Sequence, residues 1–471
     1  MVLWHSSRLA ALYLTVAQYP LGPPIRSPEY PQTKESFMNA CRLRCLTIAI
    51  SLFLATGLLS AQEFSRAIPE EVGMSSERLG YLTTALEEYV AEGRLAGAVT
   101  TIIRRGQVVY NEAVGYRDRE ESEVMQSNAI FRIASQTKAL VSVGVIMLQE
   151  EGLLDISDPV ASYLPAFAET TVGVAREGTE YDVVKANRPI TIRDLLTHTA
   201  GISYGTGPAG SAWAAAEITG WYFAHRTEPI RLTIDRIADL PFTTHPGQAW
   251  VYGYSTDILG ALVEEVSGMP LNEFIKNRIT DPLGMHDTHF YLPPSKSHRL
   301  AAVYNLRRGE TLLRAPEGPG METQGQYVEG PRQSFSGGAG LLSTTRDYTR
   351  FLQMLLNGGS LNGTQLLSTA SVNLMTVNHV GDLYRAPGMG FGLGFSVRED
   401  VAASGAPGSI GEFGWGGAYH STYWVDPVEQ LIVVYLTQVI PASGLDDHSN
   451  IRSLIYSAIT ERTPFLPTPQ R

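Results

Sequence analysis

Thiol groups are almost absent from this chain. It has two cysteines among 471 residues, Cys41 and Cys45, and both lie in a segment that we expect to be removed as a signal peptide. The remaining chain would then contain no thiol, which excludes disulfides, a cysteine nucleophile and thiolate metal sites. Nucleophilic chemistry based on a serine hydroxyl is left.

Charged residues are also scarce. They make up 18% of the sequence, against 44% hydrophobic residues, which suits a large globular protein with a sizeable core. Residues 1–61 hold five of the 36 basic and two of the 47 acidic side chains, so their removal leaves 31 and 45, a net charge of −14. Such an acidic surface disfavours nucleic acid and anionic membranes as partners.

The N-terminal region has no apolar run of the ~20 residues that a membrane-spanning helix needs. A shorter run at residues 46–59 lies between Arg42 and Arg44 on one side and Ser60-Ala61 on the other. This pattern predicts a signal peptide over residues 38–61, hence a periplasmic or secreted protein with no membrane association after cleavage. A retained anchor is the alternative. Residues 1–37 are Pro-rich without periodicity, and we interpret them as a doubtful N-terminal extension.

Strand patterns occur near both ends of the mature chain, with helical patterns between them. The β-branched runs at residues 98–103 and 108–114 predict a hairpin, and those at 422–425 and 431–436 predict a second one. Strands from both ends imply a single sheet. Helices are predicted at residues 135–150, 191–197, 256–266 and 345–356.

These patterns predict an α/β (α+β) fold with an antiparallel sheet lobe and flanking helices. The sheet lobe would cover about residues 66–134 and 345–471, and an inserted, mostly helical lobe about residues 135–344. Together they would form one catalytic domain over residues 62–471. No internal repeat or long linker divides it.

One lysine of the five in the chain has a serine three residues before it. This pair, Ser135 and Lys138, opens the predicted helix at 135–150. Three residues are nearly one helical turn, so the hydroxyl and the amine would lie side by side on one face. A serine needs a proton acceptor within hydrogen-bond reach before it attacks a carbonyl, and this spacing supplies one.

Two further stretches carry groups that fit the same chemistry. Tyr252-Gly253-Tyr254 follows a turn and precedes the predicted helix at 256–266, which puts phenol groups at the mouth of a loop. A tyrosine that shares its proton with a nearby lysine can accept the serine proton and return it to a leaving group. Trp415-Gly416-Gly417 precedes the last hairpin, and paired glycines in a strand indicate that something approaches the backbone closely.

Taken in order, Ser135-x-x-Lys138, Tyr252-Gly253-Tyr254 and Trp415-Gly416-Gly417 resemble the three signatures of the serine β-lactamase and penicillin-binding-protein superfamily. The chain is most similar to the family VIII carboxylesterases, relatives of class C β-lactamases in which Trp-Gly-Gly stands where the lactamases have Lys-Thr-Gly. Phrases at residues 195–201, 338–343 and 390–394 are also typical of the superfamily. The likeness extends from about residue 66 to the C-terminus.

The resemblance implies a role for each matching residue. Ser135 would be the nucleophile, Lys138 its activating partner and Tyr252 the general base and acid, and which of Lys138 and Tyr252 takes the first proton stays open. The oxyanion hole would use the backbone N–H groups of Ser135 and Ala418. The residues expected to bind substrate are Trp415, Gly416, Gly417, Tyr254 and His420.

The implied activity is hydrolysis of carboxylic esters, with short acyl chains expected, through an acyl-enzyme intermediate. The implied partner is a small-molecule ester, with no metal or organic cofactor and an oligomeric state that the sequence does not determine. Tyr254 replaces the asparagine usual in lactamases, and Trp415 replaces a lysine that would attract a β-lactam carboxylate. A β-lactamase, a D-amino-acid peptidase and a non-catalytic cell-wall binding or sensor module are the alternatives.

Several residues have competing interpretations. Ser203 lies in Gly201-Ile-Ser203-Tyr-Gly205, the spelling of a nucleophile elbow, but lacks the strand before it and the helix after it. His286 and His289 have no third ligand at helix spacing, which favours ordinary surface histidines over a metal site. Core packing is the alternative for Tyr252 and Tyr254, and for His420 the alternative is that it satisfies a buried polar group. Residues 213–223 predict either an acyl pocket or a packed helix.

Overall fold

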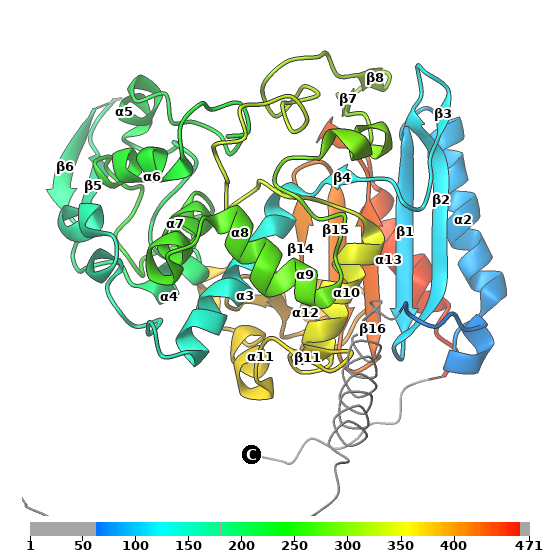
Figure 1. Ribbon diagram of the computed structural model, residues 1–471. Coiled ribbons are helices and arrows are strands. Elements are labelled where there is room, and N and C mark those ends of the chain that lie inside the picture. The colour runs from blue at the N-terminus through cyan, green and yellow to red at the C-terminus, as the bar shows by residue number, and fades with distance from the viewer. Residues whose placement is uncertain (1–62, 179, 462–471) are drawn as a thin grey trace, which may run out of the picture. The chain divides into compact units, whose positions relative to one another are not determined.

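The first and last hairpins of the catalytic unit pair with each other in one sheet. Figure 1 shows the computed structural model, which describes residues 63–178 and 180–461. The first hairpin is β1 (Gly97–Arg104) with β2 (Gln107–Asp118), and the last is β15 (Ser421–Asp426) with β16 (Leu431–Leu436). β1 pairs antiparallel with β16, with Val99 opposite Leu436. The prediction that both ends meet in one sheet is therefore confirmed.

The complete sheet has eight strands in the order β12-β13-β14-β15-β16-β1-β2-β3, and every neighbouring pair is antiparallel. Its other members are β3 (Glu123–Val124), β12 (Met389–Phe391), β13 (Ser396–Arg398) and β14 (Phe413–Gly417). The glycine-rich β14 meets β13 only through its first half, Phe413 and Gly414. Its second half keeps β15 as its one partner strand among the described residues.

Helices cover both faces of the sheet, so β1 and β16 are buried along their whole length. α2 (Ser76–Ala91) and α13 (Asp447–Ser457) pack on the face to which Ile102 points. α3 (Thr137–Glu150) and α10 (Thr345–Leu356) pack on the opposite face, to which Ile103 points. Adjacent strand residues point to opposite faces. The apolar run of β1 therefore contributes side chains to the core on each face of the sheet.

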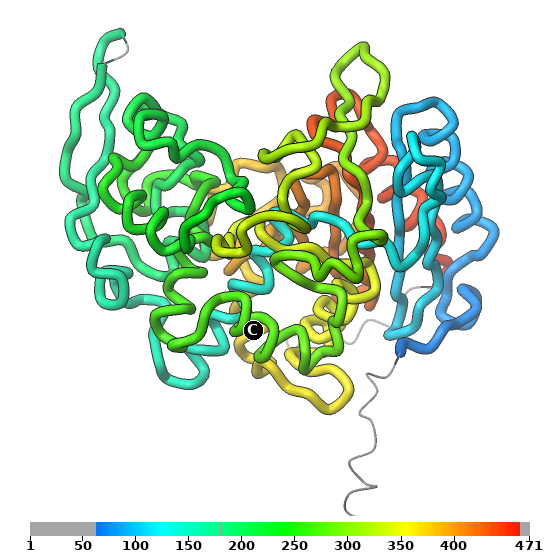
Figure 2. The backbone as a smooth tube through the Cα atoms, turned by 45° about the horizontal axis from the view of Figure 1, so that its top comes forward, coloured from blue at the N-terminus to red at the C-terminus, as the bar shows by residue number. Residues whose placement is uncertain are grey.

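Between β4 (Phe131–Arg132) and α10, helices outnumber strands, and most of these helices lie to one side of the sheet (Figures 1 and 2). Besides α3, the α-helices in this stretch are α4 (Ile192–Leu196), α5 (Gly210–Ala215), α6 (Ile230–Ala238), α7 (Ser255–Ser267), α8 (Leu271–Ile275) and α9 (Asp281–Leu283). Short strands accompany them: β5 (Thr171–Ala175), β6 (Tyr181–Lys185), β7 (Tyr304–Leu306), β8 (Leu313–Arg314) and β9 (Leu342–Ser343). After α10 come β10 (Ser360–Leu361), β11 (Thr364–Gln365), α11 (Thr369–Met375), α12 (Val401–Ser404) and β17 (Val439–Ala442).

The predicted helices form close to the expected bounds. α10 has the predicted bounds, because the side chain of Thr344 caps it by accepting from the amide of Asp347. The helix predicted at residues 135–150 differs at its start. Ala134–Gln136 form a 3₁₀ turn and the α-helix begins at Thr137. Ala134 has a φ of 43°, a left-handed backbone conformation that residues other than glycine rarely adopt. The chain therefore turns sharply into the helix.

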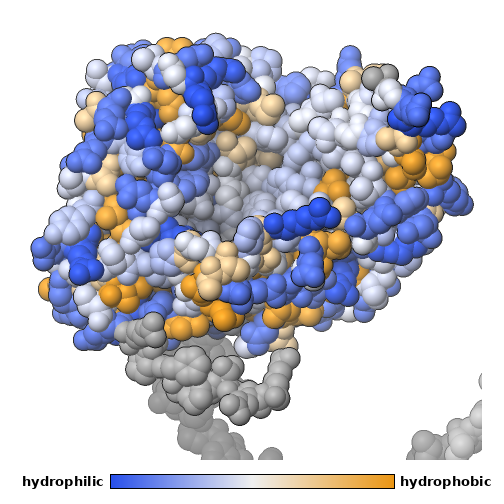
Figure 3. All heavy atoms as spheres, turned by 180° about the vertical axis from the view of Figure 1, so that it is seen from behind, coloured by the Kyte–Doolittle hydropathy of each residue, from blue (hydrophilic) through white to orange (hydrophobic). Residues whose placement is uncertain are grey.

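The described residues form one compact unit. The predicted extension over residues 1–37, the signal peptide over 38–61 and both cysteines lie outside the described residues. Within the described ranges, no helix has both the length and the apolar composition needed to cross a bilayer. The face opposite to that in Figure 1 is mostly hydrophilic, with apolar residues scattered over it rather than gathered in one patch (Figure 3).

Candidate active site

Ser135 and Lys138 lie side by side, as the three-residue spacing predicts. The Nζ atom of Lys138 is 3.4 Å from the Oγ atom of Ser135. Ser135 belongs to the 3₁₀ turn before α3, and Lys138 belongs to the first turn of that helix. Both side chains are buried, Ser135 at 9% and Lys138 at 2% exposure. The amine therefore meets the hydroxyl within the protein rather than in bulk water.

Lys138 has two more hydrogen-bond partners, and both are neutral oxygens. Its Nζ donates to the phenol oxygen of Tyr204 at 3.0 Å and to the carbonyl oxygen of Gly338 at 2.8 Å. The nearest carboxylate in this network is Asp257, whose Oδ1 accepts from the amide of Gly338 at 3.0 Å. Burial raises the pKa of Asp257, while the charge of Lys138 acts in the opposite direction. One residue, Gly338, therefore lies between the buried amine and the buried carboxyl, with its carbonyl bound to the first and its amide to the second.

Tyr252 brings a second phenol to the same place. It lies in the loop before α7, and the Nζ atom of Lys138 is 4.7 Å from the centre of its ring. Its phenol oxygen accepts a hydrogen bond of 3.0 Å from the indole N–H of Trp415 on β14. Trp250 stacks on the ring with centroids 5.6 Å apart. Trp415 of the sheet lobe and Trp250 of the same loop thus both fix the position of the Tyr252 ring.

Tyr204 is the residue that the sequence reasoning missed. Its ring meets that of Tyr252 edge-on at 5.7 Å, and its hydroxyl contacts Lys138 as described. Burial, followed by the nearby groups Tyr252 and Asp257, raises the pKa of Tyr204 well above its ordinary value. Tyr204 therefore keeps its proton and acts as a neutral hydrogen-bond partner. Tyr204 lies within the Gly201-Ile-Ser203-Tyr-Gly205 motif, which in the sequence points to Ser203 as a possible nucleophile and not to Tyr204.

Ser203 is engaged in local structure. Its Oγ donates to the carbonyl oxygen of Thr206 at 2.8 Å and accepts from the amide of the same residue at 3.0 Å. Thr243 also donates to it, and the side chain is buried. The hydroxyl of Ser203 therefore stabilises the backbone of its own loop, as serine side chains in turns often do. This agrees with the interpretation that Ser203 is not the nucleophile.

Ala418 lies beside Ser135 because Gly417 allows a close approach. A Cβ atom at Gly417 would be 2.6 Å from the carbonyl oxygen of Ile133, two residues before Ser135. Only glycine fits there, and the end of β14 consequently packs against the turn that carries the nucleophile candidate. The amides of Ser135 and Ala418, predicted to form the oxyanion hole, come from residues that line the same cavity.

That cavity has a volume of about 340 Å³. It is lined by Ser135, Tyr204, Trp221, Tyr252, Trp415, Gly416, Gly417 and Ala418. None of these residues carries a formal charge. Cavities of about 480 and 510 Å³ occur elsewhere among the described residues, but neither contains Ser135 or Lys138.

Two residues predicted to bind substrate are not among those that line the cavity. Tyr254 is fully buried, donates to the carbonyl oxygen of Gly220 at 2.5 Å and stacks on Trp213. The imidazole of His420 hydrogen-bonds to Asp447 at the start of α13. Of the stretch at 213–223, Trp221 lines the cavity while Trp213 is packed in the core.

Of the two histidines considered as metal ligands, His286 is exposed and His289 is half-buried. The Nε2 atom of His289 is 3.1 Å from the Nζ of Lys296, and burial, followed by that charge, lowers the pKa of His289 to about 4. His198 was not singled out in the sequence. It is buried with its ring 4.8 Å from that of Tyr252, and burial, followed by the charge of Lys138, lowers its pKa well below the usual range.

A sheet built from both chain ends, with a helical insertion at its side, is the β-lactamase/transpeptidase-like fold. The family model described as Beta-lactamase matches residues 82–454, which is most of the chain. The chain therefore belongs to the beta-lactamase family, and the predicted fold class and family resemblance are confirmed. It is a β-lactamase-fold hydrolase with esterases among its relatives.

Among curated proteins, Esterase EstB of Burkholderia gladioli is 32% identical over 76% of this chain and 89% of its own length. Protein Rv1367c of Mycobacterium tuberculosis is 34% identical over 77% and 90%. A putative D-alanyl-D-alanine carboxypeptidase of Escherichia coli is 26% identical over 85% and 92%. Among solved structures, EstCE1, a hydrolase with promiscuous acyltransferase activity, has a TM-score of 0.70 and 29% identity over 81% of this chain and 99% of its own.

Proposed function

We propose that this protein is a serine esterase that hydrolyses neutral carboxylic esters through an acyl-enzyme intermediate. The observation that carries the proposal is the 3.4 Å approach of the Lys138 amine to the hydroxyl of Ser135, which lines a small cavity together with Tyr252. Nucleophile and proton acceptor within this reach are what acyl transfer requires. The esterase names among the relatives support the same class of reaction.

The reaction would proceed in two half-reactions. The Oγ of Ser135 attacks the ester carbonyl while its proton passes to the Lys138 and Tyr252 pair, which we treat as one coupled acceptor. The amides of Ser135 and Ala418 would hold the negative charge that develops on the carbonyl oxygen. As the intermediate collapses, the ester C–O bond breaks and the proton passes from Tyr252 to the departing alkoxide. Alcohol leaves and the acyl group stays on Ser135.

Water completes the cycle. It attacks the acyl carbonyl, gives its proton to the same pair, and the second intermediate collapses as the proton returns to the Oγ of Ser135. The carboxylic acid is released and the resting state is restored. No group beyond this chain's residues and water takes part in these steps.

The chemistry of the cavity supports neutral substrates of small size. A peptide C-terminus or a β-lactam carries a carboxylate, which proteins usually bind with an arginine or a lysine. The residues that line the cavity include neither, and Trp415 supplies an apolar indole instead. A volume of about 340 Å³ lies at the lower end for small-molecule sites, which supports short acyl groups.

The carboxypeptidase names among the relatives make peptidase or β-lactamase activity the second candidate. The two candidates separate when p-nitrophenyl butyrate and nitrocefin are assayed side by side on the same preparation. We expect turnover of the ester and little or none of the β-lactam. Turnover of nitrocefin alone would overturn the proposal, and stable acylation of Ser135 without turnover would indicate a non-catalytic module.

The nucleophile is tested by labelling with a fluorophosphonate, followed by digestion and mass spectrometry. We expect the added mass on the peptide that holds Ser135 and none at Ser203, and the Ser135→Ala variant should not be labelled. The Ser203→Ala variant should still label, which makes it the matched control. We further propose action in the periplasm or outside the cell, on the strength of the pattern at residues 38–61, which N-terminal sequencing of the protein exported from its native host tests.

A further inference from the structure

The turn that carries Ala418 contains a residue in an unfavourable backbone conformation. Residues 418–420 link β14 to β15, and the amide of His420 donates to the carbonyl oxygen of Gly417 at 3.0 Å to close the turn. His420 has a φ of 64°. A side chain with a Cβ is disfavoured there, whereas glycine adopts the conformation freely. Contacts between His420 and neighbouring residues can offset this cost.

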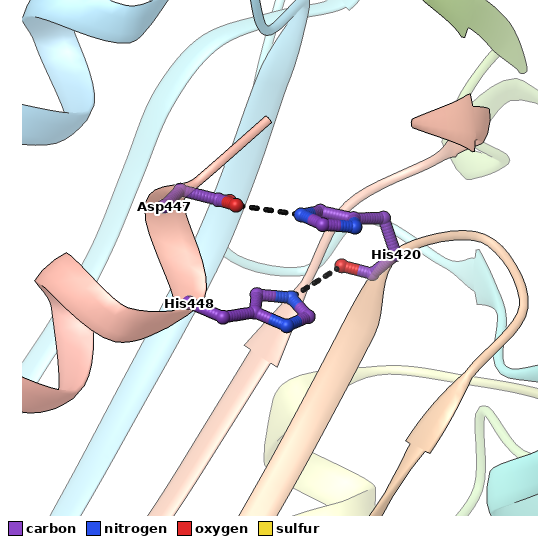
Figure 4. A group of neighbouring side chains, drawn as sticks. All are labelled: His420, Asp447 and His448. Carbon is purple, nitrogen blue, oxygen red and sulfur yellow. Dashed lines mark hydrogen bonds and ion pairs between the residues drawn. The ribbon is translucent and has the colours of Figure 1, made fainter. Parts of the chain in front are cut away.

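Asp447 and His448, at the start of α13, make contacts that fix His420. The imidazole Nε2 of His420 is 2.6 Å from the Oδ1 of Asp447, and the Nε2 of His448 is 3.1 Å from the carbonyl oxygen of His420 (Figure 4). The two imidazole rings also stack with centroids 4.0 Å apart. Side chain and backbone of the same strained residue are therefore both bound to one helix end.

The carboxylate of Asp447 is itself fixed. It is fully buried, and its second oxygen accepts from the phenol of Tyr435 on β16 at 2.6 Å. Burial alone would raise the pKa of Asp447, but the hydrogen bond and charge of His420 hold it below the ordinary value. A buried carboxylate bound on both oxygens does not move easily, so it is a firm anchor for the turn.

We propose that His420 and Asp447 form a clamp that positions the Ala418 amide of the oxyanion hole. This proposal rests on the esterase function proposed above, and it makes both residues positioning residues rather than catalytic ones. The clamp acts by holding a left-handed residue two positions after Ala418, so that the amide keeps its direction towards the cavity. Oxyanion contacts stabilise the transition state more than the bound substrate, so loss of the clamp lowers kcat more than it changes KM.

The same three side chains could also suggest a metal site, because they are the one group of three potential ligands found among the described residues. The geometry favours the clamp. Stacked imidazoles have nearly parallel ring planes, 18° apart here, which does not aim both Nε2 lone pairs at one ion. Each Nε2 also already has a hydrogen-bond partner within the protein.

A pair of substitutions that differ by one methyl group tests the clamp. His420→Ala removes the imidazole but keeps the Cβ that makes the conformation unfavourable, and we expect kcat for p-nitrophenyl butyrate to fall about tenfold with KM nearly unchanged. His420→Gly removes the strain together with the imidazole, so kcat should stay within about threefold of the wild type. The glycine variant therefore rescues what the alanine variant loses.

Asp447→Asn extends the test to a double-mutant cycle. We expect Asp447→Asn to lower kcat in the wild-type background. In the His420→Gly background, where no clamp is needed, the same substitution should leave kcat nearly unchanged. Gln430 supplies the control, because it is another left-handed residue, with a φ of 49°, in the exposed turn after β15. Replacing Gln430 by alanine or glycine should leave kcat unchanged. Thermal unfolding of each variant checks that it is folded.

The outcomes distinguish the clamp from its alternatives and from failure of the proposed function. Equal loss in His420→Ala and His420→Gly would show that the imidazole does something other than offset the cost of the left-handed backbone. No loss in either variant would show that the clamp is dispensable. Either result would overturn the proposal. Activity lost with EDTA and restored by Zn²⁺ would also overturn it. If the wild type hydrolyses no ester, the esterase proposal fails. Amide hydrogen exchange of residues 414–422 then tests whether the clamp holds the turn, independently of activity. His420→Ala should then exchange faster and His420→Gly should be insensitive to Asp447→Asn.

Discussion

The indole N–H of Trp415 donates a hydrogen bond of 3.0 Å to the phenol oxygen of Tyr252. The two residues are 163 positions apart and come from different lobes. A donor aimed at a phenol oxygen stabilises that oxygen as its proton leaves, which a general base requires. The Trp-Gly-Gly signature thus supplies a polar contact to Tyr252, the proposed base, in addition to an apolar wall.

Trp415→Phe should lower kcat roughly 10–100-fold with little change in KM, because a hydrogen bond to a group that gains negative charge is worth roughly 1.5–3 kcal/mol. Steady-state kinetics on p-nitrophenyl butyrate measures this. Trp250→Phe is the matched control, because Trp250 stacks on Tyr252 but its indole N–H has no partner in the described part of the chain. Equal effects of the two substitutions would show that ring packing, not the hydrogen bond, matters.

Tyr204→Phe should lower kcat by roughly 10–100-fold, because the buried amine of Lys138 loses one of its three oxygen partners. The control is Tyr254→Phe. It loses the hydrogen bond to Gly220 outside the cavity, so it should reduce the melting temperature while leaving kcat near the wild-type value. Should Tyr204→Phe retain full kcat, the third contact of Lys138 has no part in the reaction.

Gly417→Ala should lower kcat at least about tenfold, because its methyl group would lie 2.6 Å from the carbonyl oxygen of Ile133 and push the β14 turn away from Ser135. Gly416→Ala is the neighbouring comparison. Its methyl group would meet only the carbonyl oxygen of Ser421, at 3.2 Å, so the backbone should keep its place and the change should fall mainly on KM. Similar kcat values for both variants would contradict the close approach.

Stability should fall between pH 7 and pH 5, in part through His289. Burial, followed by Lys296, lowers the pKa of His289 to about 4 in the folded protein, whereas the unfolded chain titrates near 6.5. Below pH 6.5 the unfolded chain therefore gains a proton that the folded one does not, which lowers the free energy of unfolding by roughly 1–2 kcal/mol at pH 5. Urea unfolding of His289→Asn at both pH values should show a smaller drop, while the exposed His298→Asn keeps the wild-type drop.

Local rules explain which parts of the fold could be predicted. β1, β16 and α10 carry strong periodicity and clear end signals, so their bounds were predicted within a residue or two. The 3₁₀ turn before α3 could not be predicted, because the left-handed conformation of Ala134 is imposed by neighbouring chain segments and not by alanine itself.

The chain itself decides that Ser135 and Lys138 are neighbours, because one helical turn joins them and no distant contact is needed. It also determines which residues can form the sheet, through apolar runs at both ends. Only the tertiary structure decides that Tyr204 joins Lys138, that Trp415 reaches Tyr252, and that Tyr254 and His420 lie away from the cavity lining. These relations depend on how loops from separate lobes pack together, and nothing in a residue's local sequence fixes the direction in which its side chain meets a segment 60 or 160 positions away.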